Sequence, residues 1–359
     1  MSIPAGDGAG ADDLLWSEQG TTPDHIEAAL RELLRERHAS NRELAPARVL
    51  NLVVVVDRAW KGEVSNRLEQ VGRYHASRTV LCAVEDGRTE LDATAVMAYD
   101  QRTPGGIGVM YEMIEIDMGP SHVAHLDTIV DPVIASELPT VLWSPHGHEE
   151  AVHALIGMID VMLLDSDQLL EPAEALARTT ELLDAAYVVD LAWLRTVPWR
   201  ERLAASFDPP DRRLRLHELE GLAVRYKPSS TASALLMAGW LVARLNWEPG
   251  PLRPDNGSGL RGTAARPSGE ISVALEPSEQ DVPGLAGVTV SCCEGFSLTL
   301  DRGRGGLTAR ERAGAAERTW QILGASRGEG GILGEGVRQA LLRDPTYGPA
   351  LAAALRFCG

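Results

Sequence analysis

One run of cationic and hydroxyl side chains is the first stretch of this sequence that could carry chemistry. Gly72-Arg-Tyr-His-Ala-Ser-Arg78 brings Arg73, His75, Ser77 and Arg78 close together along the chain. Guanidinium groups bind phosphates and carboxylates through paired hydrogen bonds, so this turn could hold such an anion. The same side chains could instead pair with acidic groups of the protein and fix a corner between a helix and a strand. Because the turn lacks the G-x-G-x-x-G spacing, it is not predicted to bind a dinucleotide.

A second run combines tryptophan with arginine. Asp190-Leu-Ala-Trp-Leu-Arg-Thr-Val-Pro-Trp-Arg200 contains Trp193, Arg195, Trp199 and Arg200. Both residue types are enriched among the residues that contribute most to binding at protein–protein interfaces. Tryptophans are also common in cores, and the pattern does not separate an interface from a core. We therefore treat both runs as candidates either for contact with a partner or for a structural corner.

The other polar residues do not form a known catalytic set. Two histidine groups, His122-x-x-His125 and His146-Gly-His148, have spacings that metal sites also use. With nine histidines in the chain such spacings arise easily by chance. The sequence has no G-x-S-x-G or Walker motif, and Asp57 is expected to cap the helix that follows it. No catalytic residue, cofactor or metal ligand is therefore predicted.

The overall charge narrows the classes of partner. The chain has 359 residues, with 34 lysines and arginines against 51 aspartates and glutamates, which gives a net charge of −17. So acidic a chain is repelled by nucleic acid and by anionic membrane surfaces, and neither is expected as a partner. No apolar run of about 18 residues occurs, and Met1 to Gly10 shows no signal-peptide pattern. The four cysteines include no C-x-x-C pair, so a reduced, cytoplasmic protein is expected.

The first cationic run lies inside a predicted β-α-β unit. Arg48 to Asp57 is a run of Val and Leu that fits a central strand buried on both faces. Apolar residues at helical spacing predict a helix over 60–74, and a strand is predicted at 78–84. Alternating residues at 91–99 and 109–118 indicate an antiparallel extension. Further alternation of helices and strands up to residue 187 predicts a layered α/β domain with a mostly parallel sheet.

A second unit is predicted to begin at residue 188. Its expected elements are strands at 213–218, 221–226, 270–276, 288–293 and 296–301, an apolar helix at 229–246, a loop over 249–269, and terminal helices at 308–323 and 337–355. The expected fold is α/β: two consecutive layered α/β units, with a mixed, mostly parallel sheet in the first, an α+β arrangement in the second, and terminal helices. The predicted divisions are a disordered segment 1–20, an N-terminal helix 21–45, domains 46–187 and 188–305, and C-terminal helices 306–359.

Four stretches, taken in order, resemble a known family. They are Arg48-Val-Leu-Asn-Leu-Val-Val, Gly72-Arg-Tyr-His-Ala-Ser-Arg78, Glu137-Leu-Pro-Thr-Val-Leu-Trp143 and Asp190-Leu-Ala-Trp-Leu-Arg-Thr-Val-Pro-Trp-Arg200. Over residues 45 to 305 they resemble the OpcA family, the glucose-6-phosphate dehydrogenase assembly proteins of actinobacteria and cyanobacteria. The resemblance implies a non-catalytic protein that binds glucose-6-phosphate dehydrogenase and promotes its active oligomeric form in the oxidative pentose phosphate pathway. A composition rich in Ala and Arg favours an actinobacterial member.

Two other functions stay open at this stage. The cationic turn with Arg73, His75 and Arg78 could make the protein an α/β enzyme or sensor that binds a phosphosugar or a nucleotide. The histidine groups could make it a metallohydrolase. The missing catalytic motifs favour an allosteric activator, because such a protein needs only a higher affinity for the active form of its partner.

Overall fold

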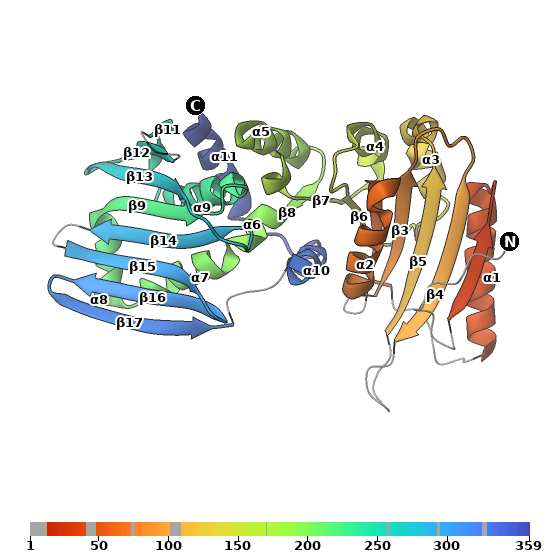
Figure 1. The fold of residues 1–359 in the computed structure, drawn as a ribbon, viewed down its shortest axis with the longest axis horizontal. Helices are drawn as coiled ribbons and strands as arrows, with labels where there is room; N and C mark the ends of the chain where they lie inside the picture. The colour runs from red at the N-terminus through yellow and green to blue at the C-terminus, as the bar shows by residue number, and fades with distance from the viewer. Residues whose placement is uncertain are drawn as a thin grey trace. The chain divides into compact units, whose positions relative to one another are not determined.

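The computed structural model describes residues 13–40, 48–72, 76–100, 109–169, 171–255, 257, 259–292, 295–324 and 329–359. The chain divides into two units, each built from three separate segments (Figure 1). Unit 1 comprises Met1–Leu164, Ala185–Val189 and Leu333–Leu341, and unit 2 comprises Asp165–Asp184, Asp190–Ile332 and Leu342–Gly359. Within the described ranges, no helix has the length and apolar character needed to cross a membrane.

Unit 1 is built on one mixed sheet, in the order β1-β4-β5-β3-β2-β6-β7-β8. Its strands are β1 (Leu14–Glu18), β2 (Leu50–Asp57), β3 (Ser77–Val84), β4 (Asp92–Asp100), β5 (Val109–Met118), β6 (Thr140–Trp143), β7 (Val161–Leu164) and β8 (Tyr187–Asp190). The strands β5, β3, β2, β6 and β7 are parallel to one another, whereas β4 is antiparallel to both β1 and β5. The predicted mixed, mostly parallel sheet is confirmed, but β5 belongs to the parallel set and the antiparallel extension consists of β4 and β1.

β2 lies near the middle of the sheet because its side chains are apolar on both faces. Every residue from Leu50 to Val56 is buried. The polar exception, Asn51, donates its side-chain amide to the carbonyl of Ala135 at 2.9 Å and accepts the N–H of Ala135 at 3.0 Å. Such a strand needs cover on both sides. The helix α2 (Lys61–Gly72) packs on β3, and α1 (Pro23–Ser40) packs on β1 and β4 and contacts α3 (Leu126–Val130), which contacts α4 (Glu149–Leu155).

Unit 2 contains a second sheet, ordered β10-β12-β13-β9-β14-β15-β16-β17, with β11 paired to β12. Its strands are β9 (Leu219–Tyr226), β10 (Glu248–Pro249), β11 (Arg253–Pro254), β12 (Leu260–Arg266), β13 (Gly269–Pro277), β14 (Leu285–Cys292), β15 (Phe296–Gly303), β16 (Gly306–Ala313) and β17 (Ala316–Leu323). Its helices are α5 (Pro172–Leu183), α6 (Leu191–Arg195), α7 (Val197–Ser206), α8 (Pro210–Arg213), α9 (Thr231–Arg244) and α11 (Tyr347–Cys358), and α10 spans Glu329–Gln339. β9 and β13 are parallel, and the other neighbouring strands of this sheet are antiparallel.

The helix α9 is the hydrophobic centre of unit 2. Its residues from Ala232 to Val242 are all buried, and it packs against β9, β10, β13 and α11. The contact with α11 requires Gly239, because a Cβ atom there would lie 2.3 Å from the carbonyl oxygen of Ala350. A helix that is apolar all round is typical of an element enclosed by other layers. The prediction of an apolar helix over 229–246 is confirmed, with ends two residues inside the predicted ones.

The largest error of the sequence analysis concerns residues 308–323, which form β16 and β17 rather than a helix. Their Ala, Arg and Glu residues favour helix locally. Gly314, with φ of 59°, instead joins the two strands, and pairing of β16 with β15 buries Leu307 and Ala309. Tertiary pairing therefore outweighs the local preference.

Two smaller predictions are also wrong. Residues 214–218 form a 3₁₀ turn rather than a strand. Leu14–Glu18, inside a segment predicted to be disordered, forms β1 and pairs with β4, while residues 1–12 lie outside the described ranges. An edge strand of five residues shows little periodicity, so its partner strand rather than its own pattern stabilises it.

Candidate functional site

The carboxyl ends of β2 and β6 are the place in unit 1 where a parallel sheet of this order usually binds ligands. The chain leaves β2 toward β3 on one side, while β6 lies on the other side of β2. Ligands of open α/β sheets bind in the crevice at such a reversal of strand order. The loops that meet here are Asp57-Arg-Ala-Trp60 after β2 and Ser144-Pro-His-Gly-His148 after β6.

Two ring side chains from these loops contact each other. Trp60 stacks on His146 with ring centroids 4.8 Å apart. Burial lowers the pKa of His146 below its ordinary value, so the stacked imidazole is neutral at pH 7. A glycine-rich loop would leave room for a pyrophosphate at this edge, whereas here the loops carry an indole and an imidazole ring that stack.

Asp57 faces across this edge instead of capping the next turn. Its Oδ1 lies 3.2 Å from Nε2 of His148. It occupies the N-cap position of the 3₁₀ turn Arg58–Trp60 but makes no side-chain capping bond. The expected capping bond is therefore wrong, and the carboxylate instead lies beside a histidine of the neighbouring loop.

The first cationic run lies at the opposite, amino end of the strands. Arg73 and His75 fall outside the described residues. Ser77 is buried at the start of β3, with its hydroxyl 3.3 Å from that of Thr79. Arg78 donates from Nη1 to the carbonyl of Val133 at 2.9 Å. The described part of the run therefore connects β3 to the segment before β6.

A buried carboxylate holds this corner. Glu112 on β5 is 1% exposed. Its Oε2 accepts from Nε of Arg78 at 2.7 Å and from Nε of Arg48 at 2.9 Å. The two guanidiniums border a surface cavity of about 480 Å³, whose other lining residues are 134–138. A carboxylate between two arginines is compensated in both charge and hydrogen bonding, which is the condition for burying it.

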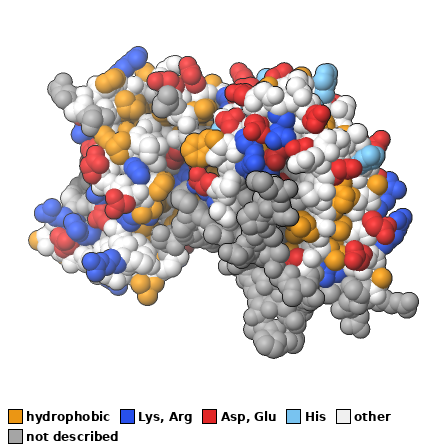
Figure 2. Space-filling model, turned by 45° about the vertical axis from the view of Figure 1, so that its right-hand side comes forward, with side chains coloured by type: hydrophobic (Ala, Val, Ile, Leu, Met, Phe, Trp, Pro, Cys, Tyr) orange, Lys and Arg blue, Asp and Glu red, His pale blue; other side chains and the backbone are white. Residues whose placement is uncertain are grey.

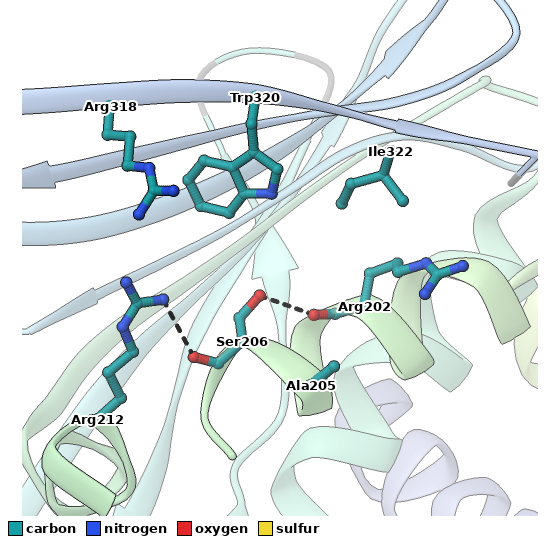
Figure 3. Close-up of a pocket in the computed structure, with 7 residues that line it drawn as sticks. All are labelled: Arg202, Ala205, Ser206, Arg212, Arg318, Trp320 and Ile322. Atoms are coloured by element: carbon teal, nitrogen blue, oxygen red, sulfur yellow. Dashed lines mark hydrogen bonds between the residues drawn. The ribbon is translucent and has the colours of Figure 1, made fainter. Parts of the chain in front are cut away.

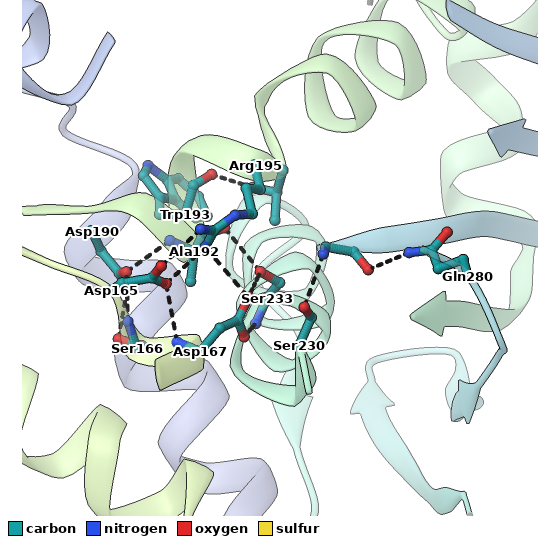
Figure 4. A network of polar contacts seen from close by, with 12 residues as sticks. Asp165, Ser166, Asp167, Asp190, Ala192, Trp193, Arg195, Ser230, Ser233 and Gln280 are labelled. Carbon is teal, nitrogen blue, oxygen red and sulfur yellow. Dashed lines mark hydrogen bonds and ion pairs between the residues drawn. The ribbon is translucent and has the colours of Figure 1, made fainter. Parts of the chain in front are cut away.

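A buried polar network lies where α6 begins in unit 2 (Figure 4). Asp190 is 1% exposed. Its Oδ1 accepts the backbone N–H of Ala192 at 2.9 Å and of Ser166 at 3.1 Å. Its Oδ2 accepts the hydroxyl of Ser166 at 2.7 Å and that of Tyr347 at 3.0 Å. Burial raises the pKa of Asp190 to about 6, although these hydrogen bonds act in the opposite direction.

Two further aspartates complete the network (Figure 4). The guanidinium of Arg195 donates to both carboxylate oxygens of Asp165, each at 2.7 Å. Asp167 accepts the N–H of Ser233 at 2.9 Å and its hydroxyl at 2.5 Å. Burial, and then the adjacent charge of Asp165, raises the pKa of Asp167. The network thus joins the turn after β7 to α6 and α9, and its members are enclosed in the interior of unit 2.

The rest of the second run is also buried in unit 2. Trp193, Trp199 and Arg200 are 3%, 1% and 8% exposed. The guanidinium carbon of Arg200 lies 3.4 Å from the ring centroid of Trp193, and Nε1 of Trp193 donates to Asp344 at 2.9 Å. Burial lowers the pKa of Arg200 to about 10, which leaves the side chain charged at pH 7. The structure therefore brings the four singled-out residues of this run together in one interior region.

Sequence reasoning missed the acidic partners of these arginines. Glu112 is 34 residues from Arg78 and Asp165 is 30 residues from Arg195, so no short motif joins them. A usable signal was Asp165-Ser-Asp167 directly after an apolar strand, where polar side chains meet the carboxyl edge of a sheet.

The histidine groups are placed differently from a metal site. Nδ1 of His122 accepts the N–H of Gly119 at 3.2 Å, while His146 and His148 make the contacts described above. Among the residues that the structure describes, no three or more His, Cys, Asp or Glu side chains are grouped so as to hold a metal ion.

Comparison with known proteins points to one family over most of the chain. Residues 68–181 match the model described as the glucose-6-phosphate dehydrogenase subunit N-terminal domain, and residues 186–351 match that of the corresponding C-terminal domain. The OxPP cycle protein OpcA of Synechococcus elongatus is 30% identical over 150 residues, which are 41% of this chain and 34% of that protein. Its counterpart in Nostoc punctiforme is 29% identical over 41% of this chain and 32% of that protein. The match thus spans about a third of the length of these relatives.

Solved structures give weaker matches. A 3-ketoreductase, KijD10 of Actinomadura kijaniata, superposes with a TM-score of 0.49 and 9% identity over 87% of this chain and 95% of its own. An aldose-aldose oxidoreductase of Caulobacter crescentus gives 0.43 and 10% identity over 86% and 95%.

Proposed function

Because this chain belongs to the OpcA family of glucose-6-phosphate dehydrogenase subunits, we propose that it is a non-catalytic protein that binds glucose-6-phosphate dehydrogenase and raises its activity by favouring the active oligomeric form. The observation that carries this proposal is the match of two successive family domains to residues 68–181 and 186–351. The activator must bind the active form of the enzyme more tightly than the inactive form. A coupling of about 1–3 kcal/mol would shift the equilibrium about 5- to 150-fold.

The geometry of unit 1 supports a binding role. At the carboxyl edge of β2 and β6, where an enzyme of this architecture would hold its cofactor, the Trp60 and His146 rings stack instead. Asp57, the acid best placed for catalysis, lies 3.2 Å from Nε2 of His148. These contacts are consistent with a protein that has the α/β fold of such enzymes but binds a partner through its surface.

For the two sequence runs we propose the structural alternative. Arg78 is held by Glu112, and Trp193, Arg195, Trp199 and Arg200 are buried in unit 2. A side chain in the interior influences a partner only through the shape of the surface above it. The role of Arg73 and His75 stays a prediction, since both lie outside the described residues.

Co-elution with enzyme kinetics tests the proposed function. The purified chain and the cognate dehydrogenase are passed together through a size-exclusion column, and KM and kcat are measured with and without the chain. We expect a shared peak at the mass of a larger assembly and a lower KM or a higher kcat. Separate peaks with unchanged kinetic constants would show that the proposal is wrong.

Alanine variants test the structural role of the runs. Arg78→Ala should lower the melting temperature because the buried Glu112 keeps one guanidinium instead of two. Arg200→Ala should lower it because the guanidinium that packs on the Trp193 ring is lost. At a temperature where both variants are folded, each should activate the dehydrogenase as well as the wild type. Lost activation with an unchanged melting temperature would instead assign the residue to the contact surface.

A further inference from the structure

A groove in unit 2 lies between the helices α7 and α8 and the edge strand β17 (Figure 3). Its volume is about 360 Å³, within the range of small-molecule sites. Its side chains are mainly cationic and apolar: Arg202 from α7, Arg212 from α8, and Arg318, Trp320 and Ile322 from β17. None of these residues belongs to the two runs singled out in the sequence.

Strand register explains why three residues of β17 line one wall. Side chains alternate between the faces of a strand, so Arg318, Trp320 and Ile322 point to the same side. Their cross-strand partners on β16 are Glu311, Ala309 and Leu307. In Figure 3 the guanidiniums of Arg212 and Arg318 face one another across the open space, while Arg202 lies toward the other end, near Ile322.

Positive charge in this groove exceeds the available counter-charge. Arg212 pairs with Glu311 at 2.8 Å and donates to the carbonyl of Ser206 at 3.4 Å. Arg318 has its guanidinium carbon 5.4 Å from the ring centroid of Trp320. Over the described ranges, neither Arg202 nor Arg318 makes an ion pair, and Nε of Arg202 is buried without a hydrogen-bond partner. Three guanidiniums thus share one carboxylate.

This imbalance is unusual for a chain of net charge −17. On the face seen in Figure 2, acidic and basic side chains are interspersed. Clustered guanidiniums repel one another, and a bound anion removes that repulsion. Arginine binds phosphate oxygens through two parallel hydrogen bonds, which a dianionic phosphate can offer to more than one guanidinium.

We propose that this groove binds a small phosphate monoester. The phosphate lies between Arg212 and Arg318, and the carbon body of the ligand rests on the ring of Trp320 and the side chain of Ile322. Oxygen substituents at the far end of the body accept from the guanidinium of Arg202. The apolar wall explains why an ester is favoured over free phosphate, since an aromatic face packs against sugar C–H groups or a base.

Calorimetric titration of the isolated full chain tests this site. The probes are glucose 6-phosphate and AMP, with inorganic phosphate and glucose as comparisons. We expect at least one of the two esters to bind with one site per chain and to bind more tightly than inorganic phosphate, while glucose gives no binding. If neither ester binds more tightly than glucose, or if inorganic phosphate equals both esters, the proposal is overturned.

A matched pair of variants places the binding in the groove. Arg318→Gln should weaken ester binding about tenfold or more, because it removes a charge-assisted hydrogen bond. Arg310→Gln is the control, because it changes the net charge by the same amount. Arg310 is exposed on β16, and its side chain lies on the opposite face of the strand from Leu307, Ala309 and Glu311. Arg202→Gln provides a second test should the first variant fail to fold. Equal weakening by the control and the groove variants would overturn the assignment.

This inference goes beyond the proposed function and can fail without it. The titration needs no dehydrogenase, and the co-elution experiment needs no phosphate ester. If the chain activates the dehydrogenase but binds neither ester, the proposed function stands and the proposed phosphate site is wrong.

Discussion

Replacement of Asp190 tests the buried network of unit 2 most directly. The carboxylate accepts four hydrogen bonds, two from the backbone N–H groups of Ser166 and Ala192 and two from the hydroxyls of Ser166 and Tyr347. Asp190→Ala leaves both N–H groups buried without an acceptor. Since each such group costs about 1–3 kcal/mol, we expect a loss of about 2–6 kcal/mol in the free energy of unfolding.

Asp190→Asn should cost much less. The amide oxygen can keep both backbone N–H bonds, and the amide N–H₂ can donate to the two hydroxyls, which rotate to accept. We expect a loss of about 1 kcal/mol or less at pH 7, because both buried backbone N–H groups keep their acceptor. Asp208→Asn, at an exposed position, is the control for the loss of one carboxylate.

The same variant predicts a pH dependence. Burial raises the pKa of Asp190 to about 6, from 3.8 in the unfolded chain. Between these values the folded protein binds the extra proton, so the stabilisation from this group is fully present below pH 3.8 and is lost as the pH rises through 6. The wild type should therefore lose about 2 kcal/mol relative to Asp190→Asn between pH 4.5 and pH 7.

Urea denaturation followed by circular dichroism at pH 4.5, 5.5 and 7 measures these differences. If Asp190→Asn destabilises the protein as much as Asp190→Ala does, the ionised carboxylate rather than its acceptor geometry holds the network. If the difference between the wild type and Asp190→Asn does not change with pH, the buried carboxyl has no raised pKa. Either result would refute this account of the network.

Three further predictions concern single side chains. Arg195→Met should lower the free energy of unfolding by about 3–5 kcal/mol, because Asp165 keeps a buried charge without its partner; a loss below about 1 kcal/mol in urea denaturation would contradict this. The fluorescence of Trp60, measured as the difference between wild type and Trp60→Phe, should fall on acidification because an imidazolium quenches a stacked indole. Since burial lowers the pKa of His146, the midpoint should lie below pH 6.5. A higher midpoint would contradict the lowered pKa. Burial raises the pKa of Cys82 to about 12, so mass spectrometry should find it unlabelled by a thiol reagent at pH 8 until urea is added, and rapid native labelling would disprove this.

Strong local patterns led to correct predictions. The uninterrupted Val and Leu residues of β2 indicate a strand buried on both faces, and all of Leu50 to Val56 is buried. The apolar residues of α9 likewise indicate a helix enclosed on all sides. In both cases the signal lies within one element, where a periodic pattern or an apolar run is sufficient to predict the element and its burial. The order of four such stretches was also enough to indicate the family.

The chemistry of the polar residues was decided by contacts between distant segments. Arg78 could hold a ligand or an internal acid, and only the fold places Glu112, on another strand, against it. The hairpin of β16 and β17 likewise depends on β15, because its own residues favour a helix.

By itself, the sequence determined the α/β class, the buried central strand and the family, since each follows from residues that are neighbours along the chain. The tertiary structure alone decided which arginines are neutralised and which, like Arg202 and Arg318, face an open groove. The physical reason is that burial and charge compensation depend on side chains tens of residues apart, which become neighbours only when the strands pair.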